Sequence, residues 1–183
     1  MVEILEQEFS RISMDLGCRT DDRIVTIVQS KQAYYATTGA MEWSGGQFDG
    51  KIRIPVSETK SISPQTRRTF AHETVHACLA TMGQWPSWLH EGLAQKFSGD
   101  TVPAGARTQM RAAIKAGKLP TLGAMDRNFS RMSSESAAMS YAYSLVAADL
   151  MVERYRAYGL QNILRNPERL PQVEAELDKL LVE

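Results

Sequence analysis

The spacing of apolar residues divides the chain into a small mixed segment and a mostly helical remainder. In residues 2 to 16, apolar side chains recur at helical intervals among charged ones, which predicts an amphipathic helix that ends at Gly17. Residues 24 to 28 form an almost continuous β-branched run, a pattern typical of a buried strand. Residues 33 to 37 fit a short strand or a helical turn, and the pattern does not choose between them.

A second strand is predicted at Lys51 to Val56, where polar and apolar residues alternate. The preceding residues, Thr38 to Gly50, contain glycines at positions 39, 45, 46 and 50 and predict a loop or hairpin. Pro55 has no backbone N–H to donate, so we expect this strand at an edge of the sheet. Residues 1 to 60 are therefore predicted to form one helix and a small β-sheet.

Helical spacing dominates residues 61 to 183. Ser63 and Pro64 are typical of an N-cap and a first helical position, and they predict a helix through residue 82 that Gly83 closes. Further helices are expected at residues 86–97, 106–116, 135–158, 161–165 and 171–182, with Gly159 ending the long one. No linker divides the 183 residues, so we expect a single α+β domain whose helical part follows the sheet.

The charge balance excludes some classes of partner. Lys+Arg equals Asp+Glu at 21 each, so no net field favours nucleic acid or an anionic membrane. The N-terminal residues are acidic, lack the apolar run of a signal peptide, and precede no stretch long enough to span a bilayer. We therefore expect a soluble protein, cytoplasmic by default, and secreted or in the cell envelope if Met1 replaces a natural leader or preceding domain.

The two cysteines, Cys18 and Cys78, are far apart and show no C-x-x-C spacing. This pattern argues against both a disulfide framework and a cysteine metal site. We therefore predict two buried free thiols.

The chemistry is concentrated in the helix predicted after Ser63, which carries the motif H-E-x-x-H at residues 72 to 76. In a helix, His72 and His76 lie one turn apart on the same face, so both imidazoles can reach one metal ion. Glu73 lies about 100° around the helix from His72, which suits a carboxylate that holds the water of a metal site. The simpler alternative is that both histidines are ordinary surface or core residues.

A catalytic zinc ion needs three protein ligands and an open position for water. His90 and Glu91 follow on the next predicted helix, so that all three histidines of the chain fall in this region. His90 and Glu91 are about 100° apart on one helix, so only one of them can point straight at the metal. Periodicity does not decide which.

The residues Phe70-Ala71-His72-Glu73 and Trp88-Leu89-His90-Glu91-Gly92-Leu93-Ala94-Gln95 resemble the paired motifs of gluzincin metallopeptidases, specifically the peptidase MA-like domains. The likeness extends upstream to a glycine-rich turn and strand at residues 45 to 55, and downstream to Tyr141-Ala142-Tyr143-Ser144. It covers about residues 20 to 160 and implies a minimal thermolysin-like catalytic domain with an edge strand beside the active-site helix. By this resemblance, one Zn²⁺ ion is bound by His72, His76 and Glu91, and Glu73 is the general base.

The implied activity is hydrolysis of a peptide bond by a metal-activated water, as in an endopeptidase or a restricted processing protease. Tyr141 matches the family's tyrosine that donates to the oxyanion, and Tyr143, about 200° around the helix, is the alternative. A peptide or protein substrate would add as a strand along Lys51 to Val56. We expect neither nucleic acid nor membrane as a partner.

Two other functions remain open from the sequence. The first is a non-catalytic binding or scaffolding module of the same fold, against which the intact Glu73 argues. The second is an aminopeptidase, because Gly39-Ala40-Met41-Glu42-Trp43 resembles the G-A-M-E-N motif whose glutamate binds a substrate's free amine. Trp43 stands where that motif has asparagine. In this hypothesis Glu42 would bind the substrate.

Overall fold

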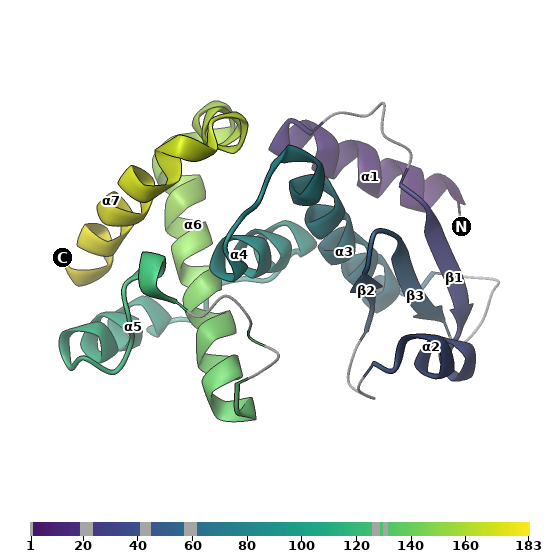
Figure 1. Ribbon diagram of the computed structural model, residues 1–183, viewed down its shortest axis with the longest axis horizontal. Coiled ribbons are helices and arrows are strands. Elements are labelled where there is room, and N and C mark those ends of the chain that lie inside the picture. The colour runs from purple at the N-terminus through teal and green to yellow at the C-terminus, as the bar shows by residue number, and fades with distance from the viewer. Residues whose placement is uncertain (1, 19–23, 41–44, 57–61, 126–128, 130–131) are drawn as a thin grey trace.

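A computed structural model describes the chain except residues 1, 19–23, 41–44, 57–61, 126–128 and 130–131. The sheet and its covering helices lie at one end of the molecule, and the C-terminal helices lie at the other (Figure 1). Two helices between these ends, α3 (Pro64–Met82) and α4 (Ser87–Ser98), pack against each other and join the two parts. The described part is mostly helical with one small mixed sheet, which confirms the α+β class.

The sheet has the strand order β1–β3–β2, with β1 at Thr26–Ser30, β2 at Gln47–Phe48 and β3 at Ile52–Val56. β1 pairs with β3 in parallel, and β2 pairs with β3 in antiparallel fashion. The connection from β1 runs directly into helix α2 (Lys31–Thr38), which settles the undecided segment at 33 to 37 as helical. The predicted edge position of Lys51 to Val56 is wrong, because β3 is the central strand.

Pro55 is nevertheless placed where its missing N–H costs nothing. The backbone N–H of Ile52 donates to Val25 O at 2.9 Å, so the backbone nitrogens of Ile52 and Ile54 point toward β1. The backbone nitrogens of Arg53 and Pro55 then point toward the opposite neighbour, β2. On that opposite side β2 reaches only as far as Arg53. The predicted alternation of the strand is confirmed. Its predicted edge position is wrong because the two-residue strand β2 pairs beside it, although β2 leaves Pro55 itself unpaired on that side.

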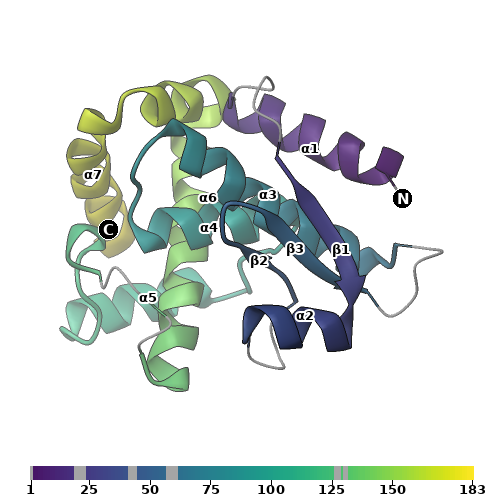
Figure 2. The same cartoon turned by 45° about the vertical axis from the view of Figure 1, so that its right-hand side comes forward.

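Helix α1 (Val2–Leu16) packs on α3, and α3 packs on β3, so that the two helices form a layer against the sheet (Figure 2). The side chains of Ile52, Ile54 and Val56 are buried against this layer together with Phe70 and Ala77 of α3. Ser63 caps α3 as predicted, because its hydroxyl accepts the N–H of Thr66 at 3.0 Å.

The prediction of two free thiols is wrong, because Cys18 and Cys78 form a disulfide. Cys18 follows the end of α1, where Gly17 turns the chain with φ 73°, and Cys78 lies in α3. The packing of α1 on α3 brings their Cα atoms to 5.7 Å. Sequence spacing does not show this contact, because the residues are 60 positions apart.

The remaining helices form one core with α3 and α4. They are α5 (Ala106–Lys115), α6 (Ser134–Arg165) and α7 (Leu170–Val182), with short 3₁₀ turns at Leu122–Ala124 and Pro167–Arg169. Helix α4 lies against α6 so closely that a Cβ atom on Gly92 would come within 2.3 Å of the Ser144 carbonyl oxygen. Trp88, Leu89 and Leu93 of α4 are fully buried in this core.

Helix α6 does not end at Gly159, as the sequence predicted. It bends at Arg156, which has φ 55° and ψ −178°, and then continues to Arg165. A Cβ atom on Gly159 would lie 2.9 Å from the Tyr155 Cβ, so the glycine serves this close approach rather than a helix end. Among the described residues, no helix is both long enough and apolar enough to cross a membrane.

Candidate metal centre

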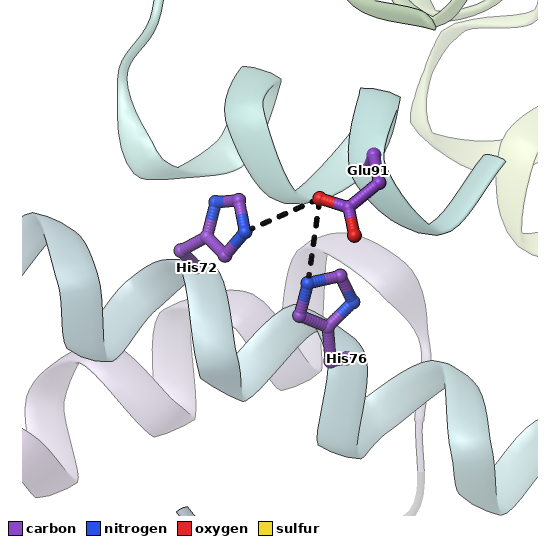
Figure 3. Close-up of side chains that lie close together, drawn as sticks. All are labelled: His72, His76 and Glu91. Atoms are coloured by element: carbon purple, nitrogen blue, oxygen red, sulfur yellow. Dashed lines mark ion pairs between the residues drawn. The ribbon is translucent and has the colours of Figure 1, made fainter. Parts of the chain in front are cut away.

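Two helices bring together the side chains of His72, His76 and Glu91 (Figure 3). Glu91 Oε2 lies 3.5 Å from His72 Nε2 and 3.8 Å from His76 Nε2. One ligand atom from each of the three residues lies within 4.8 Å of the other two. This group contains two imidazole nitrogens and one carboxylate oxygen, which are donors that zinc prefers.

The packing of each helix explains why these side chains meet. On α3, the two imidazoles lie one turn apart, with ring centroids 4.8 Å apart and planes at 77°, while Val75 and Leu79 are fully buried on another face. On α4, burial of Trp88 and Leu89 sets the rotation of the helix. That rotation directs Glu91 toward α3.

The charges in the group suit metal binding. Burial, together with His72 and His90, lowers the pKa of His76 to about 4, which keeps its imidazole neutral. Burial acts to raise the pKa of Glu91, but the hydrogen bond from His72 and the neighbouring imidazoles outweigh it and lower the pKa. Burial opposes the charged form of His72, yet Glu91 and Glu73 raise the pKa of His72. A cation bound by this group would therefore compete with the proton that Glu91 and Glu73 favour on His72.

Glu73 lies beside this group but does not belong to it. Its side chain is buried, and this burial, with the charge of Glu91, raises the pKa of Glu73 to about 7 against the opposing charge of His72. The chain before β2 passes close by: a Cβ atom on Gly46 would lie 3.1 Å from Glu73 Oε1 and 2.6 Å from Thr69 Cγ2. Glycine at this position therefore makes room for the Glu73 carboxylate.

An open cavity of about 810 Å³ contains the group and Glu73. Its walls come from the segment Gly45 to Phe48, from the exposed sides of α3 and α4, and from Tyr141 of α6. Arg68 and Asp100 form an ion pair on its rim. The strand that lines the cavity is β2, whereas the residues of Lys51 to Val56 do not line it.

The two candidate tyrosines have different surroundings. Tyr141 lines the cavity, and burial with the charges of Glu91 and Glu73 raises the pKa of its phenol to about 12, so it remains a hydrogen-bond donor. Tyr143 is fully buried and borders a different cavity. Burial and the charge of Asp178 raise the pKa of Tyr143. Only Tyr141 is brought to the metal-ligand group.

His90 is not part of the three-residue group, although it lines the same cavity. Its Nδ1 lies 3.3 Å from the Nδ1 of His76, on the opposite side of that ring from Glu91. Burial lowers the pKa of His90. The structure therefore separates the two candidates for a third ligand. Glu91 lies near the Nε2 atoms of His72 and His76, whereas His90 lies near the Nδ1 atom of His76.

Two residues of the site were missed from the sequence. Gln95, one turn after Glu91, donates to the Glu91 carbonyl oxygen at 3.1 Å and to the Tyr141 carbonyl oxygen at 3.0 Å. Gly46, beside Glu73, is predicted by the sequence only as part of a loop or hairpin. The spacing of Gln95 after Glu91 was visible in the sequence, but nothing local shows its bond to Tyr141. Glu42 of the aminopeptidase hypothesis lies outside the described residues.

Comparison with known proteins places the chain in a family. A family model described as "Protein of unknown function (DUF1570)" matches residues 67–161. No curated protein and no solved structure matched the chain. The matched segment holds the whole ligand group, Glu73 and Tyr141. It covers more than half of the sequence, and the chain therefore belongs to this family.

Proposed function

We propose that this protein is a zinc-dependent hydrolase of peptide bonds, acting as an endopeptidase or a restricted processing protease. The observation that carries the proposal is the convergence of His72, His76 and Glu91 within 4.8 Å in an open cavity. Two neutral nitrogens and one carboxylate oxygen form the donor set of many catalytic zinc sites, which leave one position for water. The resemblance to the gluzincin motifs supports the same assignment.

The residues that would hold the ion are His72 and His76 through Nε2 and Glu91 through its carboxylate. When bound, zinc would supply a Lewis acid that activates water and polarises a carbonyl group. Glu73 would serve as the general base, because a buried carboxylate with a pKa near 7 can accept a proton from water and return it to the leaving amine. Its place in the same cavity supports this role.

Tyr141 would donate its hydroxyl to the oxyanion that develops on the substrate carbonyl. Its high pKa supports this role, because a phenol that stays protonated at neutral pH is a hydrogen-bond donor. An extended peptide would reach these residues by pairing with β2, which is an edge strand and lines the cavity. The cavity is open to solvent, which would leave room for such a peptide.

The test combines metal analysis with a cleavage assay. We expect purified wild-type protein to bind one zinc ion and to cleave members of an unbiased peptide library. Glu73→Gln should retain the metal and lose cleavage by about 100-fold or more. Glu6→Gln, an exposed residue on α1, is the matched control and should behave as wild type. Absence of zinc binding, or cleavage unaffected by Glu73→Gln, would refute the proposal.

A further inference from the structure

We infer that His90 is a positioning residue for the metal centre. His90 holds the His76 imidazole by accepting a hydrogen bond from its Nδ1–H. The inference rests on the proposed function, because it concerns how His76 presents its Nε2 atom to a metal ion. The observation that carries it is the 3.3 Å contact between the two Nδ1 atoms. It assigns a role to a residue that periodicity offered only as a rival ligand.

The direction of this hydrogen bond follows from the chemistry of imidazole. Two ring nitrogens form a hydrogen bond only if one carries the proton and the other offers a lone pair. A metal at Nε2 of His76 takes the lone pair of that atom, so the remaining proton of the neutral ring must be on Nδ1. His90 Nδ1 must then be the acceptor, and the proton of His90 must be on Nε2.

The fold holds the His90 imidazole where its Nδ1 can accept the Nδ1–H of His76. His90 directly precedes Glu91 on α4, so the helix sends the two side chains to opposite ends of the same His76 ring. Trp88 and Leu89 fix the rotation of that turn by complete burial. The rings of His76 and His90 are not stacked, since their planes are tilted by 36° and their centroids lie 5.5 Å apart. Contact through the nitrogens therefore defines the orientation of His76.

Ligating histidines usually donate their second N–H to an acceptor, and loss of that acceptor weakens metal binding by about 10- to 100-fold. Three substitutions separate this role from simple packing. Asn at position 90 places its Oδ1 acceptor at the same bond distance from Cβ as Nδ1 of histidine. Leu has nearly the same shape as Asn but no acceptor. Gln carries its acceptor one bond further out, where Nε2 was.

The main experiment measures zinc affinity by competition with a chromophoric chelator, alongside the thermal stability of the metal-free proteins. We expect His90→Leu and His90→Gln to weaken zinc binding by about 10- to 100-fold, and His90→Asn to stay within about threefold of wild type. Equal affinity of His90→Leu and wild type would overturn the inference and leave the proposed function intact. Wild-type protein that binds no zinc would instead refute the proposed function.

Nitrogen-15 NMR of the zinc-loaded wild type tests the same contact without any substitution at the site. The chain has only three histidines, so each imidazole can be identified. We expect a proton on Nδ1 of His76, and on Nε2 but not Nδ1 of His90. A proton on Nδ1 of His90 would overturn the inference, whatever the variants show.

Discussion

The side-chain amide of Gln95 donates to the backbone oxygen of Tyr141 at 3.0 Å, and so joins α4 to α6 one turn beyond Glu91. The same amide donates to the Glu91 carbonyl oxygen at 3.1 Å. One side chain thus connects the backbone of the third proposed ligand with that of the proposed oxyanion donor.

We therefore expect Gln95→Met, which keeps the length of the side chain and removes both donors, to lower the free energy of unfolding by about 1 to 3 kcal/mol. It should also weaken zinc binding, because the turn that carries Glu91 loses its link to α6. Urea unfolding and chelator competition measure the two effects. Gln32→Met, at an exposed position on α2, is the control, and a Gln95→Met protein that matches it in both measurements would contradict the prediction.

Gly46 makes room for the proposed general base. We expect Gly46→Ala to lower cleavage at least about tenfold while zinc binding is retained, because the new methyl group would displace Glu73. The nearest atom to that methyl group would be Thr69 Cγ2 at 2.6 Å, and Thr69→Ser removes it. The double variant Gly46→Ala/Thr69→Ser should therefore recover part of the activity, with Thr69→Ser alone as the control. Full activity of Gly46→Ala would contradict the steric account.

The disulfide ties the end of α1 to the helix that carries both proposed histidine ligands. Its removal in Cys18→Ser/Cys78→Ser should lower the free energy of unfolding by about 4 kcal/mol, as expected for a loop of this length. Urea unfolding of protein prepared under oxidising conditions measures this difference. Thiol titration of that protein after unfolding without reductant should find no free cysteine, and two free thiols would contradict the pairing.

Glu8 of α1 is buried and accepts hydrogen bonds from Arg11 at 2.8 Å and from Arg67 of α3 at 2.6 Å. Burial acts to raise the pKa of Glu8, but the bonds and charges of the two arginines outweigh it and lower the pKa below its usual 4.5. The folded protein therefore favours the carboxylate more than the unfolded chain does. This contribution is complete above the unfolded pKa and is lost as pH falls through the lower folded pKa.

Glu8→Gln should consequently reduce stability at pH 7 by about 1 to 2 kcal/mol, since both arginines are partly exposed to solvent. The difference from wild type should shrink as pH is lowered below the unfolded pKa of glutamate. Urea unfolding across a pH series tests this convergence. A difference that stays constant down to acidic pH would show that the charge of Glu8 does not contribute.

Much of the local structure could be predicted because short segments determine it. Ser63 and Pro64 start α3 where the sequence placed its first turn, and Gly83 follows its end. The alternation in β3 and the helical spacing of α1 were also visible. The predicted end of helix α6 is too early. A glycine is typical of a helix end, but Gly159 instead lies near a bend, where a Cβ atom would come too close to Tyr155.

The sequence by itself determined the helical placement of His72 and His76, because 3.6 residues per turn bring positions four apart onto one face. It also determined that either Glu91 or His90 would follow on a second helix. Periodicity left that choice open and the motif resemblance favoured Glu91; the tertiary structure brings Glu91 rather than His90 to both Nε2 atoms, through the burial of Trp88 and Leu89 and the close approach of Gly92 to Ser144. The central position of β3 and the Cys18–Cys78 pairing were decided in the same way. A periodic pattern states which face of an element is apolar, but not which distant surface covers it.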